Sequence, residues 1–236
     1  MKKIKNSIIV PIYNEEKRMG MFLKELIQFS KKSLKNYEIL FVDDGSTDNT
    51  LELLKNIKKN NDEVKIISYK INKGKGHAVK TGVLSARGDK VLFIDADGSI
   101  APNEIPPMLD RLEKYDIVVG TRYSKRAKVK QPTLRHITGT LFNLYVNLLF
   151  HINIYDNLCG FKGFRKRVVN TLFQNLISKR WIFDVELFYK IRKNKYSLYE
   201  MPIKWEYKEN TKMSVLDPFK MLFQLIKLRF QLKDER

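Results

Sequence analysis

The sequence predicts an α/β fold built on a mostly parallel sheet with helices on both faces. Within the first hundred residues, short apolar runs alternate with longer segments whose apolar residues recur at helical spacing. The apolar runs lie at 7–11, 37–42, 64–69 and 90–95, and the helical segments lie at 16–30, 48–60 and 75–86. Strands and helices that alternate in this way pair the strands in parallel through right-handed crossovers. The 236 residues, 43% of them hydrophobic, are enough for one substantial core.

Polar residues mark the point where the second of these strands gives way to a helix. The strand runs into Asp43 and Asp44, and the next helix begins near Thr50. Ser46 or Asp48 has the right position and side chain to cap that helix. We assign the capping role to Asp48 and not to Asp44, which leaves Asp44 for a different function.

The second half of the chain is expected to add one more strand and three helices. The strand is expected at 116–119, and the helices at 141–154, 185–192 and 215–232. For 141–154 we expect packing against the core, whereas 215–232 interleaves basic and apolar residues in the pattern of an interfacial helix. We therefore divide the chain into a domain at 1–212 and a C-terminal amphipathic basic helix at 213–236. No apolar run reaches the roughly 18 to 20 residues that a spanning helix needs.

The composition favours an anionic partner. The net charge is +19 and the pI is near 9.8, which suits nucleic acid, acidic lipid headgroups or phosphorylated substrates. Cys159 is the single cysteine, so no intramolecular disulfide forms and a reducing compartment is expected. The three histidines have no zinc-ligand spacing with it. The basic N-terminus lacks the pattern of a signal peptide, so we expect the protein to stay in the cytosol.

Two carboxylates, Asp95 and Asp97, directly follow an apolar strand. Parallel strands deliver their carboxyl ends to the ligand crevice of an open sheet, so this pair is placed to share one divalent ion. Hard oxygen ligands suit Mg²⁺ or Mn²⁺, completed by substrate phosphates. An acidic loop with solvated charges is the alternative. Gly74 and Gly76 precede a helix as in phosphate-binding loops, but they match neither the Walker A motif nor the Rossmann fingerprint.

Five short motifs occur in a fixed order along most of the chain. They are Pro11-Ile12-Tyr13-Asn14-Glu15, Val42-Asp43-Asp44-Gly45-Ser46-Thr47-Asp48, Asn72-Lys73-Gly74-Lys75-Gly76, Asp95-Ala96-Asp97-Gly98 and Gly120-Thr121-Arg122-Tyr123. With these motifs the chain resembles glycosyltransferase family 2, which has the Rossmann-like GT-A fold, and within it the polyprenyl-phosphate (dolichyl-phosphate) sugar synthases. Residues 158–164 and 180–186 look like the branch that makes dolichyl-phosphate glucose.

The resemblance implies a nucleotide-sugar site in the first hundred residues. It places Pro11, Tyr13, Glu15 and Asp44 in the nucleotide pocket, with Asp95 and Asp97 on a metal ion that binds the donor diphosphate. Such an ion stabilises the charge that grows on the diphosphate as the glycosidic bond breaks. The resemblance also places Lys73 and Lys75 near the nucleotide. The alternative is that both are solvated charges of a surface loop. Mannose-transferring relatives carry Leu-Gln where this chain has Gly98-Ser99, so Ser99 becomes a weaker third metal ligand and a UDP-sugar is favoured.

The resemblance also implies a phosphate acceptor. Arg122 and Arg135 occupy positions similar to those of arginines that hold the acceptor phosphate, which guanidinium groups contact bidentately; a solvated basic face is the alternative. A lipid monophosphate, with a second pKa of roughly 6, is largely ionised and attacks the sugar without a general base, inverting the anomeric carbon. Asp184 is then expected to orient the sugar or an acceptor-site arginine. Glu186 is expected on the surface of its helix.

Together these features favour metal-dependent, inverting transfer of a hexose, glucose from UDP-glucose, to polyprenyl phosphate by a peripheral protein on the cytoplasmic face of an anionic membrane. The alternatives of the same fold use UDP-GlcNAc or GDP-mannose, or glycosylate a saccharide hydroxyl with Asp184 as the base. A basic nucleic-acid-binding protein is the alternative from another class. It needs base-stacking aromatics on a basic surface, and the acidic strand ends repel phosphates, so we expect no nucleic-acid partner.

Overall fold

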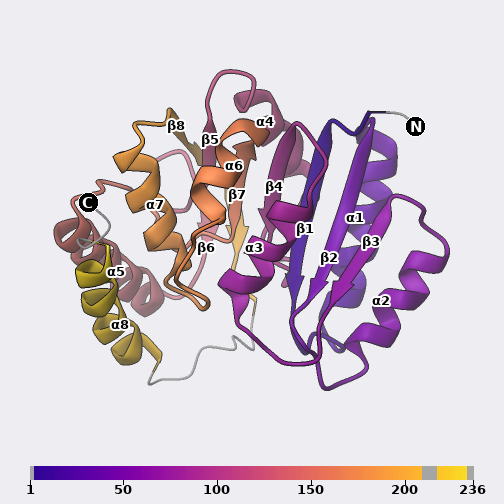
Figure 1. Cartoon of the computed structure of the whole chain (residues 1–236), viewed down its shortest axis with the longest axis horizontal. Helices are drawn as coiled ribbons and strands as arrows, with labels where there is room; N and C mark the ends of the chain where they lie inside the picture. The colour runs from indigo at the N-terminus through magenta and orange to yellow at the C-terminus, as the bar shows by residue number, and fades with distance from the viewer. Residues whose placement is uncertain (1–2, 209–216, 233–236) are drawn as a thin grey trace.

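The chain forms a three-layer α/β structure around a seven-stranded sheet (Figure 1). The computed structural model describes residues 3–208 and 217–232, apart from the side chains of residue 135 and residues 217–220. The strands of the main sheet, in spatial order, are β3 (Val64–Ser68), β2 (Tyr37–Asp43), β1 (Asn6–Ile12), β4 (Lys90–Ile94), β7 (Phe161–Arg165), β5 (Ile117–Thr121) and β8 (Leu198–Pro202). A small second sheet pairs β6 (Lys128–Lys130) with β9 (Lys204–Glu206).

Helices cover both faces of the main sheet. They are α1 (Met19–Ser33), α2 (Thr50–Lys59), α3 (Lys75–Ser85), the 3₁₀ turn η1 (Pro102–Glu104), α4 (Ile105–Arg111), α5 (Thr133–Phe150), α6 (Lys166–Phe173), α7 (Phe183–Lys193) and α8 (Asp217–Gln231). Successive side chains of a strand point to opposite faces, so each strand feeds two cores. In β1, Ile9 packs with α3, α6 and α7, whereas Ile8 and Val10 pack with α1 and α4. The α/β prediction is confirmed.

β7 is the feature of the sheet that the sequence pattern did not reveal. It lies between β4 and β5 and runs antiparallel to both, whereas β1, β2, β3 and β4 pair in parallel, as do β5 and β8. Because β7 enters from the opposite direction, it brings its first residues, not its last, to the edge where β1, β2 and β4 end. The start of β7 therefore belongs to the same edge as the acidic strand ends.

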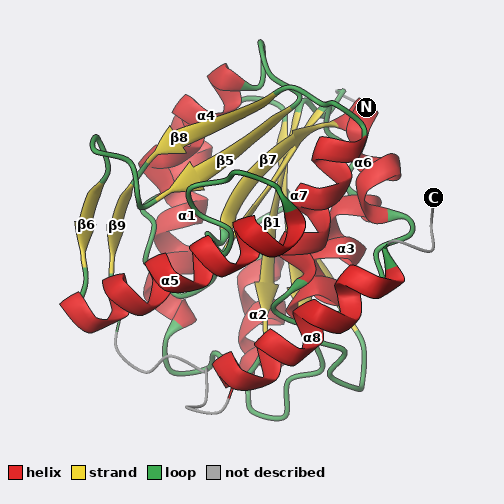
Figure 2. Ribbon diagram, turned by 90° about the vertical axis from the view of Figure 1, so that its left-hand side faces the viewer, coloured by secondary structure: helices red, strands yellow, loops and turns green. Residues whose placement is uncertain are grey.

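The two apolar helices of the second half lie side by side (Figure 2). α5 begins at Thr133, eight residues before the expected helix at 141–154, and ends at Phe150 before the left-handed residue His151. α8 buries Met221, Leu225 and Leu228 in the core, so one of its faces is a core face. The proposed boundary between 212 and 213 lies outside the described residues, and the proposed membrane contact of this helix stays a prediction.

Among the described helices, none combines the length and the apolar character that crossing a bilayer demands.

Candidate active site

The acidic pair lies where β4 ends and β7 begins. The backbone N–H of Asp95 donates to the carbonyl of Gly160 at 3.0 Å. A Cβ atom on Gly160 would lie 1.9 Å from Oδ2 of Asp95, so only glycine leaves space for this carboxylate. The antiparallel entry of β7 therefore fixes where the Asp95 side chain can lie.

Lys75 holds the Asp95 carboxylate from the other side. Its Nζ lies 2.7 Å from Oδ1 and 2.8 Å from Oδ2, and it also lies 5.4 Å from the centre of the Trp181 ring. Burial raises the pKa of Asp95, and Asp97 adds to the rise although Lys75 opposes it. Burial acts to lower the pKa of Lys75, but the carboxylates of Asp95, Asp184 and Asp97 outweigh it and raise the pKa. The four side chains thus form one electrostatic cluster.

The same cluster fits a divalent cation. The Lys75 ammonium on Asp95 stands in for a cation at the predicted metal position, and Asp97 lies two residues away. Oδ1 of Asp97 accepts the N–H of Ser99 at 2.9 Å, which fixes the turn after β4. Ser99 itself is buried. Within the described residues, no group of three or more His, Cys, Asp or Glu is arranged to hold a metal ion, so oxygen atoms of a substrate would have to complete the coordination of an ion on these two carboxylates.

Asp184 is buried at the start of α7 and is paired with Lys162 of β7. Nζ of Lys162 lies 2.8 Å from Oδ1 of Asp184 and donates to the carbonyl of Cys159 at 2.6 Å. Burial raises the pKa of the Asp184 carboxyl, although Lys162 opposes the rise. The sequence analysis did not identify Lys162 as a site residue. The signal that could have identified it is a lysine within a short apolar run.

The expectation that Glu186 lies on the surface is wrong. Glu186 is fully buried, accepts the N–H groups of Ile177 and Ser178 and pairs with Lys190 at 2.7 Å. Glu186 lies in the first turn of α7 on its buried side, where its carboxylate accepts hydrogen bonds from backbone N–H groups of the preceding loop. Its role is to connect α7 to that loop.

Asp44 joins the end of β2 to the glycine-containing loop. Its carboxylate accepts hydrogen bonds from the backbone N–H of Lys73 at 2.9 Å, the N–H of Gly74 at 2.8 Å and Nδ2 of Asn72 at 2.8 Å. Gly74 has φ +96°, a value that non-glycine residues rarely adopt. Asp44 therefore shapes the loop that starts α3 and presents Lys75.

The remaining predicted nucleotide residues follow β1. Pro11 lies in β1, Tyr13 follows it, and both are half-buried. Glu15 pairs with Arg18 at 2.6 Å, and its backbone N–H donates a hydrogen bond to the Thr50 hydroxyl oxygen at 2.8 Å. The N-cap residue of α2 is Asn49 and not the predicted Asp48, although Oδ1 of Asp48 accepts the N–H of Thr50, the first residue of the helix, at 3.0 Å. The structure brings the ends of β1, β2 and β4 to one edge.

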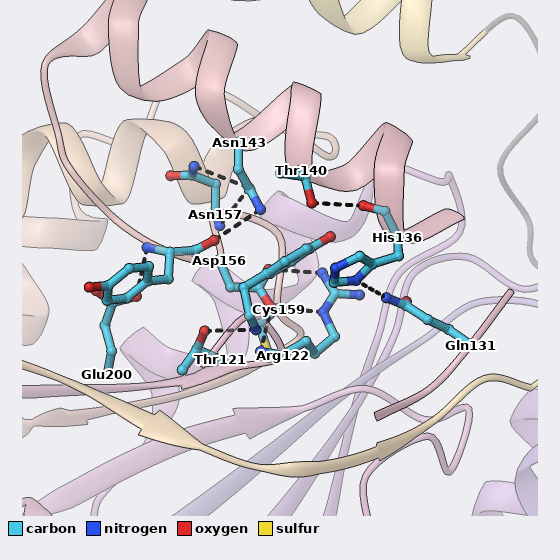
Figure 3. A network of polar contacts seen from close by, with 12 residues as sticks. Thr121, Arg122, Gln131, His136, Thr140, Asn143, Asp156, Asn157, Cys159 and Glu200 are labelled. Carbon is cyan, nitrogen blue, oxygen red and sulfur yellow. Dashed lines mark hydrogen bonds and ion pairs between the residues drawn. The ribbon is translucent and has the colours of Figure 1, made fainter. Parts of the chain in front are cut away.

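Arg122 lies beneath α5 and is paired with Asp156 (Figure 3). Its Nε and Nη2 lie 2.7 and 2.8 Å from the two carboxylate oxygens, and its backbone N–H donates to Oδ2 at 3.0 Å. Burial acts to raise the pKa of Asp156, but Arg122 outweighs it and lowers the pKa. Asp156, which sequence reasoning missed, thus occupies the guanidinium fork predicted to contact a phosphate. Arg135 lies in the first turn of α5, and its side chain is outside the described part of the structure.

The chain is similar to known proteins along most of its length. The sequence profile of Glycosyl transferase family 2 matches residues 7–173. The dolichyl-phosphate beta-glucosyltransferase of Dictyostelium discoideum is 36% identical, with 94% of this chain and 71% of that protein covered. The enzyme of the same name from Saccharomyces cerevisiae is 31% identical, with 94% and 73% covered.

A solved structure has the same fold. Glucosyl-3-phosphoglycerate synthase from Mycobacterium tuberculosis, in complex with Mn²⁺, uridine-diphosphate and glucosyl-3-phosphoglycerate, superposes with a TM-score of 0.68 at 16% identity over 94% of this chain and 77% of that one. The α/β fold of this chain is thus shared with that synthase. The chain belongs to glycosyltransferase family 2.

Proposed function

We propose that this glycosyltransferase moves glucose from UDP-glucose to a polyprenyl phosphate such as dolichyl phosphate, with inversion at the anomeric carbon. The observation that carries the proposal is the Asp95 and Asp97 pair, set at the carboxyl end of β4 among cationic side chains. Relatives that cover most of the chain are dolichyl-phosphate beta-glucosyltransferases, which supports glucose as the sugar and a lipid phosphate as the acceptor.

In this proposal Asp95 and Asp97 hold Mg²⁺ or Mn²⁺, with Ser99 as a weak further ligand. The ion, when bound, supplies positive charge where the leaving diphosphate gains negative charge. Pro11, Tyr13, Glu15 and Asp44 build the nucleotide side of the site, where Asp44 acts through the loop at 72–74. The synthase of the same fold was crystallised with Mn²⁺ and uridine-diphosphate, which supports the use of a divalent ion.

The acceptor side is assigned to Arg122 and Arg135. Because the fork of Arg122 is held by Asp156, we assign Arg122 to positioning the site and Arg135, from the first turn of α5, to direct contact with the phosphate. Asp184 keeps an orienting role because Lys162 already neutralises its carboxylate in a buried position. A phosphate acceptor needs no base, so this arrangement favours it over a saccharide hydroxyl.

An exposed apolar face supports an acceptor that arrives from a membrane. Five exposed side chains lie at heptad spacing on α5, and two more are exposed on α8, the helix that contacts α5: Leu134, Ile137, Leu141, Leu144, Leu148, Phe223 and Ile226. We call these seven residues the apolar face. α5 covers the Arg122 network with its inner side (Figure 3), so a membrane on its outer side would bring a lipid phosphate close to the acceptor residues. Large exposed apolar patches mark such contact surfaces.

A transfer assay tests donor and acceptor together. The protein is incubated with Mn²⁺, polyprenyl phosphate and a panel of radiolabelled UDP- and GDP-sugars, and the label extracted with the lipid is counted. We expect label from UDP-glucose alone, and none with EDTA. Asp97→Asn should abolish the transfer yet keep the fold, because asparagine Oδ1 still accepts the N–H of Ser99. Transfer from GDP-mannose or UDP-GlcNAc, or equal transfer with EDTA, contradicts the proposal.

A further inference from the structure

We propose that Lys75 is the resident counter-ion of the metal site: its ammonium neutralises Asp95 until a divalent ion arrives, and then moves to the diphosphate of the donor. The inference rests on the proposed use of a divalent ion and a nucleoside diphosphate. It adds a mechanism that couples the binding of the two, and names the residue responsible.

The geometry makes Lys75 and a divalent ion competitors. Nζ of Lys75 lies within 2.8 Å of both oxygens of Asp95, and a divalent ion on Asp95 needs at least one of the same oxygens. The oxygens cannot turn away, because the backbone of Gly160 lies against the carboxylate. Binding of the ion therefore requires the ammonium to move.

The backbone that carries Lys75 is fixed, so the movement is confined to its side chain. Gly74, just before it, donates its N–H to the buried Asp44. A Cβ on Gly76, just after it, would lie 2.7 Å from Cβ of Phe183, which shows how closely α3 packs against the start of α7. The four-carbon stem of lysine is flexible, and its ammonium is a compact charge that serves carboxylate and phosphate equally well.

Lys162 pairs with Asp184 and so adds a second lysine to this cluster, but it is not free to move in this way. Its side chain is 1% exposed, pairs with Asp184 and donates to the carbonyl of Cys159. The side chain of Lys75 is 15% exposed and that of Asp95 is 30% exposed, so this pair reaches solvent. The cluster thus contains one fixed cation and one replaceable cation.

Replacement of Lys75 couples the two ligands. A divalent ion on Asp95 releases an ammonium next to the position of the donor diphosphate, and the diphosphate then compensates for the lost ion pair. Each ligand bound alone has to leave either Lys75 or Asp95 without its partner, whereas the two ligands together give both residues a new partner. Each ligand therefore raises the affinity of the other by the same factor. The metal ion alone should bind weakly.

The test compares Mn²⁺ binding to three proteins by calorimetry, with and without UDP. In Lys75→Met the competitor is gone, so Mn²⁺ alone should bind about tenfold tighter than to the wild type, and the enhancement by UDP should shrink by about the same factor, a typical allosteric coupling. Lys73→Met is the matched control, because it removes the same charge two residues away, where Nζ lies over the Tyr69 ring. It should bind Mn²⁺ as the wild type does.

Either of two results with the variants overturns the inference: Mn²⁺ affinity in Lys75→Met equal to that of the wild type, or an equal gain in Lys73→Met. If Lys75→Met does not fold, Lys75→Gln keeps a hydrogen bond to Asp95 and takes its place. In the unchanged protein, Mn²⁺ affinity that does not rise with UDP also overturns it. Absence of any Mn²⁺ binding in all proteins, even with UDP, instead refutes the metal site of the proposed function.

Discussion

At the scale of single residues, the site contains three buried or half-buried carboxylates that each pair with a cation of their own. Asp95 has Lys75, Asp184 has Lys162 and Asp156 has Arg122. A buried charge without a partner is costly, so these cations are needed for the fold before they serve any reaction. A ligand can replace a cation only where the ion pair is exposed to solvent, as the pair of Lys75 and Asp95 is.

Lys162→Met should be strongly destabilising, because it leaves the Asp184 carboxylate buried and unpaired. Breaking such a pair costs about 3–5 kcal/mol, whereas the double variant Lys162→Met/Asp184→Asn should recover about 0.5–3 kcal/mol. Urea unfolding gives both values. Lys55→Met is the control, since its partner Glu52 is exposed, and it should cost about 0–1 kcal/mol. If Lys162→Met lost as little stability as the control, the buried Asp184 carboxylate would not need Lys162 as its partner.

Glu200 gives the fold a pH dependence. Burial raises its pKa from 4.5 to about 7, and the Asp156 carboxylate adds to the rise. Between these two values the folded protein holds a proton that the unfolded chain has lost, so this residue's contribution to stability falls as the pH rises through the window. Glu200→Gln stays neutral. Its stability relative to the wild type should therefore increase from pH 5 to pH 8 in urea unfolding; a difference that does not change with pH would contradict this origin.

At the scale of elements, local sequence patterns predicted the strands and helices that depend on neighbouring residues. The strands β1 to β4 and helices α1 to α3 follow from apolar periodicity, and Asp95 and Asp97 stand out because they end a strand. β7 did not follow, because Lys162 and Gly163 interrupt its short apolar run and its place between β4 and β5 depends on the packing of distant segments.

The ion pairs of the site could not be predicted for the same reason. Lys75 lies 20 residues from Asp95, Lys162 lies 22 from Asp184, and Arg122 lies 34 from Asp156. No helical or strand periodicity relates residues at such separations. The sequence therefore pointed to Asp95 and Asp184 but not to Asp156, and only the fold assigned each of the three its cation.

The outer side of α8 should bind membranes without supporting the core. Phe223 and Ile226 are exposed, whereas Met221 and Leu225 are buried. Phe223→Ser/Ile226→Ser should lower binding to anionic vesicles in a flotation assay by about a hundredfold or more, since burying each large apolar side chain contributes about 1.5–3 kcal/mol, and should leave thermal stability unchanged. Met21→Ser, which removes an equally exposed side chain from α1, should bind as the wild type does. Equal flotation of both variants would place the contact elsewhere.

At the scale of the whole molecule, the apolar face and the net charge point to the same kind of partner. The chain carries a net charge of +19. Exposed basic residues surround the apolar face: Lys128, Lys130 and Lys204 lie on the small sheet beside the first turns of α5 (Figure 2), and Lys227 lies on α8. Membrane contact of this kind combines apolar burial with attraction to anionic lipid.

Binding to anionic vesicles should therefore weaken with salt. Each basic residue near an anionic surface contributes about 1 kcal/mol, and the attraction extends only over the Debye length, which shrinks from about 10 Å at 0.1 M to about 3 Å at 1 M salt. Raising the salt from 0.1 to 1 M should lower binding at least about tenfold. The variant Lys128→Glu/Lys130→Glu should bind the vesicles less than the wild type at low salt. Added salt should lower its binding by a smaller factor, because part of the electrostatic attraction is already gone. The binding that remains at high salt measures the contribution of the apolar face. Salt-independent binding would mean that the apolar face acts alone and that the positive charge serves the phosphorylated substrates instead.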